Sequence, residues 1–189
     1  GTVLDSIVVE DPFTHCALYF DEAWGRHSDG VSYGHDIETS WLLWDAWEAL
    51  AVEGVSDPAL EWRTREAALG LAEAVRSRGV DASGAVLYAG GPDGPTDLDR
   101  HWWPQAEGVV GWLNAFQIGG RAEDRMAAIR VWDFIETHMV DREHGEWFAR
   151  LDAANRPLTG GVGDLKIGPW KCPYHNARAC LEVLRRIEA

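Results

Sequence analysis

Residues 33–50 read YGHDIETSWLLWDAWEAL, an apolar helical pattern whose first turn nevertheless carries a histidine, an aspartate and a glutamate. Similar segments recur at residues 101–118 (HWWPQAEGVVGWLNAFQI) and 172–188 (CPYHNARACLEVLRRIE). Glu38, Glu107 and His175 follow one another at intervals of about 70 positions, a period typical of repeated supersecondary units. The sequence therefore predicts one structural unit that occurs more than once.

Two amphipathic segments lie between these helices, at about 60–78 and 121–139, and carry apolar residues at helical spacing. Short strand-like stretches with turn residues occupy 16–24, 84–94 and 145–157. Because one helical hairpin cannot bury its inner face alone, neighbouring units must stack. We expect an all-α chain, a partial toroid of helical hairpins with short β-hairpins in the connecting loops. With fewer than three full units, the chain should form only part of a ring.

The composition restricts the classes of partner. A net charge of −14 argues against nucleic acid and anionic membrane as partners, since both require basic patches. No stretch reaches the ~20 apolar residues of a membrane span. Three scattered cysteines fit a reducing, cytoplasmic location. The 11 tryptophans fit either a wide helical core or surfaces that stack on sugars.

The first helix offers a candidate acid–base pair. His35 and Glu38 are three residues apart and share a helix face, which Trp41 continues. A carboxylate beside a histidine orients the ring and favours its protonated form. The alternative is a solvated charge cluster at a helix N-terminus.

The second and third helices add candidate sugar ligands. Trp103 and Glu107 are four residues apart, with Asn114 two turns further along the same stripe. An indole beside a carboxylate suits a sugar, through stacking and charged hydrogen bonds. Trp170 and His175 flank the start of the third helix. The alternatives are a core tryptophan, an exposed glutamate and a capping histidine.

Equivalent helix starts in a ring should meet at one rim. We therefore expect His35, Glu38, Trp103, Glu107 and His175 to converge on one pocket, and the other five histidines to lie at the surface. His35 and Glu38 have metal-ligand spacing, but further ligands are missing, and no nucleotide motif occurs, so no metal or cofactor is expected.

Four segments resemble the N-acylglucosamine 2-epimerase family, and within it the cellobiose (mannobiose) 2-epimerases: SYGHDIETSWLL (32–43), WWPQAEGVVGWLNAF (102–116), GEWF (145–148) and GPWKCPYHNARACLEV (168–183). The resemblance implies that residues 1–189 form the C-terminal half of an (α/α)6 barrel. A second half, from the same polypeptide or another chain, would supply a further histidine, an arginine and an asparagine. The chain alone is expected to be inactive or weakly active.

The resemblance also implies cofactor-free epimerisation at carbon 2 of the reducing-end sugar of a disaccharide such as cellobiose. His35 and His175 would exchange the proton through an enediolate, with Glu38 as the partner of His35. Glu107, Trp103, Trp170, Trp41 and Asn114 would bind the sugar. Three alternatives stay open: an aldose–ketose isomerase of this family, a glycoside hydrolase using Glu38 and Glu107, and a non-catalytic sugar-binding or protein-interaction half-toroid.

Overall fold

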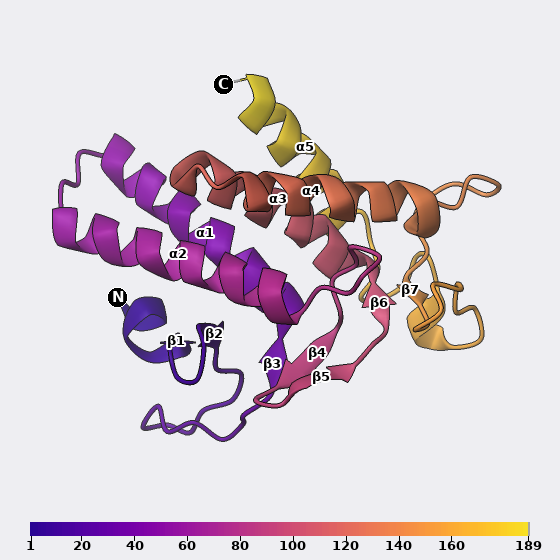
Figure 1. Cartoon of the computed structure of the whole chain (residues 1–189), viewed down its shortest axis with the longest axis horizontal. Coiled ribbons are helices and arrows are strands. Elements are labelled where there is room, and N and C mark those ends of the chain that lie inside the picture. The colour runs from indigo at the N-terminus through magenta and orange to yellow at the C-terminus, as the bar shows by residue number, and fades with distance from the viewer. Residues whose placement is uncertain (189) are drawn as a thin grey trace.

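In the computed structural model, which describes residues 1–188, helices make up most of the chain (Figure 1). The α-helices are α1 (Tyr33–Val52), α2 (Pro58–Arg78), α3 (Trp102–Gly119), α4 (Ala122–Phe134) and α5 (Tyr174–Glu188). A π-helical turn at Ile135–Met139 extends α4. The five helical segments expected from the sequence are thus confirmed, with ends that differ by a few residues.

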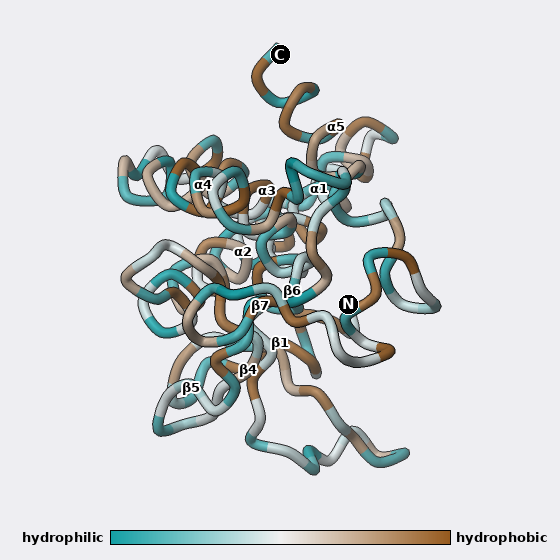
Figure 2. The backbone as a smooth tube through the Cα atoms, turned by 90° about the vertical axis from the view of Figure 1, so that its right-hand side faces the viewer, coloured by the Kyte–Doolittle hydropathy of each residue, from teal (hydrophilic) through white to brown (hydrophobic). Residues whose placement is uncertain are grey.

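The helices form two hairpins and a fifth, single helix. α1 packs against α2 and α3, while α3 also packs against α4 and α5. Figure 1 shows the α1–α2 and α3–α4 hairpins side by side, and in Figure 2 α5 leads away from them towards the C-terminus. Because α1, α4 and α5 all cover it, α3 is buried along most of its length.

Within residues 1–188, seven short strands form three antiparallel sheets near the starts of these helices. They are β1 (Val8–Val9), β2 (His15–Cys16), β3 (Val31–Ser32), β4 (Ala89–Gly91), β5 (Gly94–Asp97), β6 (Arg100–His101) and β7 (Arg150–Leu151). β1 pairs with β2, β4 lies between β3 and β5, and β6 pairs with β7. Since β3 runs directly into α1 and β6 into α3, this pairing fixes where both helices begin.

The strand expected at 16–24 is mostly wrong, because this stretch folds into a turn. The Asp21 carboxylate accepts hydrogen bonds from the backbone N–H groups of Ala23 (2.9 Å) and Gly25 (2.7 Å). An aspartate that bonds to its own following backbone favours a turn over a strand. The other two stretches, 84–94 and 145–157, do contribute to β4, β5 and β7.

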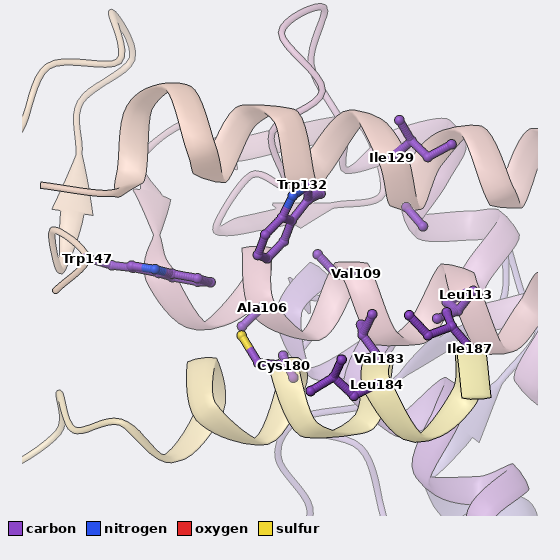
Figure 3. A pocket seen from close by; sticks show the side chains of 12 residues that line it. Ala106, Val109, Leu113, Ile129, Trp132, Trp147, Cys180, Val183, Leu184 and Ile187 are labelled. Atoms are coloured by element: carbon purple, nitrogen blue, oxygen red, sulfur yellow. The ribbon is translucent and has the colours of Figure 1, made fainter. Parts of the chain in front are cut away.

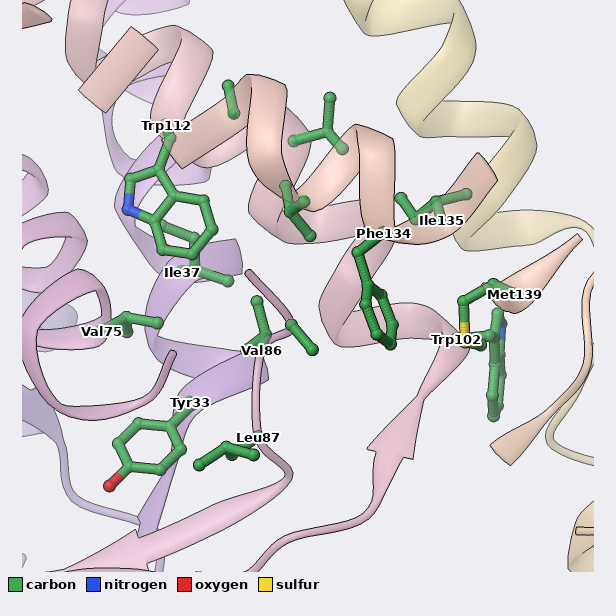
Figure 4. Packing of buried hydrophobic residues seen from close by; sticks show 14 of the residues in the cluster. Tyr33, Ile37, Val75, Val86, Leu87, Trp102, Trp112, Phe134, Ile135 and Met139 are labelled. Atoms are coloured by element: carbon green, nitrogen blue, oxygen red, sulfur yellow. The ribbon is translucent and has the colours of Figure 1, made fainter. Parts of the chain in front are cut away.

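Local signals set the helix ends, and aromatic packing sets their positions. Asp57 caps α2 by accepting from Ala59 N (3.1 Å) and Leu60 N (3.0 Å). Gly120 ends α3 in the left-handed region, at φ +73°. In the core (Figure 4), the Trp112 Nε1–H of α3 donates to the Ala72 carbonyl of α2 at 3.0 Å. This bond ties the two hairpins together.

An apolar groove of about 440 Å³ lies between α4 and α5 over α3, and we call it the α4–α5 groove (Figure 3). Its lining residues are almost all apolar: Ala106, Val109, Leu113, Ala128, Ile129, Trp132, Trp147, Ala179, Cys180, Val183, Leu184 and Ile187. Within residues 1–188, no helix has both the length and the apolar character to cross a membrane.

Candidate active site

The starts of α1, α3 and α5 meet around one indole ring. The Trp103 ring centroid lies 4.8 Å from that of His35 and 5.6 Å from that of His175. Gly34 makes this packing feasible, since a Cβ there would lie 2.4 Å from Cη2 of Trp103. The expected meeting of the two histidines is therefore found, and both imidazoles border the same tryptophan.

His175 forms the histidine–carboxylate pair of the site. Its Nδ1 lies 2.6 Å from Oε1 of Glu107, whose side chain is 1% exposed. Oε2 of Glu107 accepts a hydrogen bond from Trp41 Nε1 at 3.0 Å. An ionised carboxylate can only accept, so Nδ1 carries the hydrogen and Nε2 of a neutral His175 has a free lone pair.

The expected pairing of His35 with Glu38 is wrong. Nδ1 of His35 lies 2.7 Å from the Ser32 hydroxyl, while Oε1 of Glu38 accepts a hydrogen bond from Arg178 of α5. A guanidinium is a stronger partner for a carboxylate than a neutral imidazole. The carboxylate beside a histidine is thus Glu107, and the more accessible carboxylate is Glu38.

Arg178 is the residue of the site that the sequence analysis missed. Its Nη2 donates to Oε1 of both Glu38 and Glu107, the latter at 2.7 Å. Burial alone would lower the pKa of Arg178, but the hydrogen bonds to Glu107 and Glu38 outweigh it and raise that pKa. Its position three residues after His175, on the same helix face, was the available signal.

Three residues of the same cluster have the types of ligand atom that metal ions bind. Ligand atoms of Glu38, Glu107 and His175 lie within 4.8 Å of one another. However, Arg178 already provides the positive charge between the two carboxylates, and Glu107 uses both of its oxygens on protein donors. These residues therefore fit an internal ion-pair network better than a metal centre.

Of the other three expected sugar ligands, two are buried by protein contacts and one is exposed in a loop. Trp41 is 2% exposed and lies beneath the Arg178 guanidinium, which leaves its ring no free face for a sugar. Asn114 is fully buried and accepts from Arg186 Nη1 at 3.0 Å. Seven residues along a helix amount to about 10 Å, which removes Asn114 from the Glu107 site. Trp170 lies in the loop before α5 and is 89% exposed.

Asp36, the remaining ionisable residue of the first turn of α1, does not face the site. It is buried on the opposite side of α1, where Oδ1 accepts from Cys16 N at 2.8 Å. Burial raises the pKa of Asp36 to about 7, although the hydrogen bonds from Cys16 lower it.

Two histidines expected at the surface are also largely buried. His15 is buried, and the half-buried His101 stacks on Tyr88 with ring centroids 3.9 Å apart. Burial lowers the pKa of His101 to about 4, so this ring is neutral at pH 7. Tyr88 in turn contacts Trp103 edge-on, at a centroid distance of 6.4 Å. Sequence spacing gives no indication of this second aromatic pair.

Comparison with known proteins places this arrangement in a family. The family model described as N-acylglucosamine 2-epimerase (GlcNAc 2-epimerase) matches residues 15–179. The chain is 39% identical over 188 residues to a cellobiose 2-epimerase of Bacteroides fragilis, covering 97% of this chain and 45% of that protein. A crystal structure of a sugar epimerase from a ruminal bacterium superposes with a TM-score of 0.87 at 32% identity, over 98% of this chain and 45% of that one.

A more distant relative has a different activity. A D-mannose isomerase of Marinomonas mediterranea is 30% identical over 106 residues, which cover 55% of this chain and 26% of that protein. The chain thus spans about half the length of the curated epimerases that it matches. The match over most of its residues shows that the chain belongs to the N-acylglucosamine 2-epimerase family.

Proposed function

We propose that this chain is about half of a sugar 2-epimerase that inverts carbon 2 of the reducing-end sugar of a disaccharide such as cellobiose, without a cofactor. The observation that carries the proposal is the pair of imidazoles, His35 and His175, on one indole platform. An imidazole acts as acid or base near neutral pH, so two of them can remove and return a proton on opposite faces of one carbon.

The chemistry starts from the open-chain aldehyde. One imidazole removes the proton from carbon 2, and the C–H electron pair moves into a bond between carbons 1 and 2, which leaves an enediolate. The other imidazole then donates its proton to the opposite face of carbon 2, and the aldehyde re-forms. Nε2 of His175, whose Nδ1 is held by Glu107, is one proton carrier, and His35 is the other. Solvent exchange restores both rings.

In this proposal, the sugar is bound by side chains that keep an accessible polar atom or ring face. Oε1 of Glu38 is bound by Arg178, and its second oxygen is the carboxylate oxygen that we assign to a sugar hydroxyl. Trp103 supplies the stacking face beside the histidines, and the exposed Trp170 is a platform for the second sugar unit. Glu107 takes an orienting role in place of the hydroxyl contact expected from the sequence.

The proposal extends to the half of the barrel that this chain would form. We infer that residues 1–189 make up the C-terminal half of an (α/α)6 toroid. In this chain, α4 packs on α3 and lies next to α2. A further helix in the α4–α5 groove would pack on α5 and lie next to α4, which repeats the same arrangement. The groove is the surface that we assign to an apolar helix face of the other half. Three cysteines without a disulfide agree with a cytoplasmic location.

The geometry argues against a glycoside hydrolase. Such enzymes place two carboxyl groups on either side of the scissile bond, about 5–10 Å apart. Here Glu38 and Glu107 bind the same Arg178 nitrogen, and Glu107 has no exposed oxygen. An aldose–ketose isomerase remains the second candidate, because the D-mannose isomerase relative shares part of this chain.

Turnover of cellobiose in heavy water tests the proposal. An epimerase yields the mannose-configured disaccharide with deuterium at carbon 2. A ketose product with deuterium at carbon 1 would identify an isomerase instead. Released monosaccharide, or binding without any product, would contradict both readings.

A further inference from the structure

Arg178 occupies a built site rather than a flexible surface position. Its guanidinium carbon lies 4.9 Å from the Trp41 ring centroid and 4.5 Å from that of Tyr174. Nη1 also donates to the Tyr174 hydroxyl at 2.8 Å. Stacking against two rings fixes the plane of the guanidinium, and therefore the directions of its N–H groups.

The fixed guanidinium joins two carboxylates that would otherwise repel each other. Glu38 and Glu107 come from different helices, yet both direct Oε1 at Nη2 of Arg178. Two carboxylates at this separation, with little solvent, tend to share a proton unless a cation lies between them. A proton on Glu107 would weaken its ability to accept the Nδ1–H of His175.

We propose that Arg178 is a positioning residue that holds the Glu107 carboxylate in place against Nδ1 of His175, and so holds His175 in the tautomer with its hydrogen on Nδ1. This inference rests on the proposed function for its catalytic consequence, but not for its structural one. Arg178 lies one helical turn after His175 on α5. In this role it determines which ring nitrogen of His175 faces the sugar.

The charge balance makes the role specific. Glu38, Glu107 and Arg178 together carry one negative charge, which suits one imidazole that gains and loses a proton. Without Arg178 the cluster carries two negative charges, and a shared proton relieves them. A glutamate that is part of such a pair accepts the Nδ1 hydrogen only part of the time. The imidazole then samples both tautomers.

The test uses the complete protein that carries this chain, labelled with 15N-histidine, at pH 8. The His175 signals are assigned by their loss in His175→Gln. We expect one Nδ1–H tautomer in the wild type and a mixture in Arg178→Gln. In the same variant, kcat for exchange of the carbon-2 hydrogen should fall at least tenfold, while KM changes less than threefold. Arg178→Lys keeps the charge and should recover part of both signals.

Two further variants complete the design. Arg185→Gln removes an arginine of the same helix whose partners are Asp45 and Glu182, and should leave the tautomer and the rate unchanged. Glu38→Gln combined with Arg178→Gln restores the net charge, and should restore the single tautomer. If Arg178→Gln alone does not fold, the tautomer is measured in this double variant instead.

The outcomes separate this inference from the proposed function. A wild-type tautomer in folded Arg178→Gln overturns the positioning role, even if the exchange activity is present. A tautomer mixture in that variant, in a protein that never exchanges the carbon-2 hydrogen, supports the positioning role and overturns the epimerase. A double variant that keeps the mixture contradicts the charge argument.

Discussion

The two imidazoles of the site have unequal surroundings, although both border Trp103. His175 has a buried carboxylate on its Nδ1, while His35 has the Ser32 hydroxyl. A carboxylate stabilises an adjacent imidazolium by charge, whereas a hydroxyl offers only a dipole. In the proposed proton transfer, the two rings would therefore be suited to different steps.

Replacing either histidine tests whether both carry the proton. We expect His35→Gln and His175→Gln each to lower kcat for carbon-2 hydrogen exchange by about 10²–10⁴-fold, since a glutamine cannot carry the proton. Proton NMR of cellobiose in heavy water measures the rate. His144→Gln, at a 70% exposed side chain, is the matched control and should retain wild-type activity. Full activity in either site variant would exclude the two-histidine mechanism.

Asp36 makes stability depend on pH. Its pKa rises from 3.8 to about 7 in the fold, so the native state keeps a proton that the unfolded chain loses between those values. Stability therefore falls as pH rises through this window. Asp36→Asn keeps an oxygen for Cys16 N and cannot ionise. Between pH 4 and pH 8, the free energy of unfolding of Asp36→Asn should therefore increase relative to the wild type by on the order of a few kcal/mol. Urea denaturation measures this as a rise of the variant's midpoint relative to the wild type.

A difference in midpoint between Asp36→Asn and wild type that stays constant over this pH range would contradict the raised pKa. The measurement compares two proteins at each pH, so the titration of all other groups cancels to first order.

At the level of residues, the spacing predicted that His35, Trp103 and His175 lie together, but it missed Arg178 and paired Glu38 wrongly. Helical spacing placed His35 and Glu38 on one face, and of the two Glu38 contacts α5. It could not reveal that Arg178, 140 positions after Glu38, takes the carboxylate. Nor could it show that Asp36 turns towards β2, because that choice depends on the Cys16 backbone. Such partners come from packing between distant segments.

At the level of elements, the helices themselves were predictable, because their apolar residues recur strongly and Asp57, Pro58 and Gly120 mark their ends. The short strands were less so. Two-residue strands contain too few side chains for an alternating pattern, and their pairing depends on where the following helices lie.

The junction of α1 with α3 gives a prediction at this scale. Gly34→Ala would place a methyl group 2.4 Å from the Trp103 ring and 2.9 Å from Pro104 Cγ. The indole must then move, although alanine favours the helix by about 1 kcal/mol. We expect at least a tenfold loss of kcat with a melting temperature within a few degrees of the wild type.

Gly91→Ala, where the nearest neighbour is Asp29 O at 3.8 Å, is the matched control and should change neither quantity. Wild-type kcat in Gly34→Ala would show that the contact between Trp103 and the histidines is not needed.

On the scale of the whole molecule, the proposed half-ring predicts that the chain is insufficient by itself. We expect the purified 189-residue polypeptide to convert cellobiose at least 10²-fold more slowly than the complete protein, since positioned groups on the far side of the sugar are missing. Chromatographic quantification of epimerised product measures this. Turnover comparable to that of the complete protein would refute the half-ring.

The α4–α5 groove should be an interior surface in the complete protein. Leu184→Asp would bury an unpaired carboxylate there, and should lower the melting temperature by roughly 5–10 °C. Val52→Asp, at an 86% exposed position outside the groove, should have little effect in a calorimetric scan. Equal melting temperatures for both variants would mean that the groove stays open to solvent.

Helix α5 carries both His175 and Arg178, but rests mainly on α3, with ionic contacts from Arg185 and Arg186 to Asp45 of α1. The rest of the molecule is tied together by two complete hairpins. In the isolated chain, warming should therefore release this last helix in a local melting event, which would separate His175 and Arg178 from Glu107 before the two hairpins unfold.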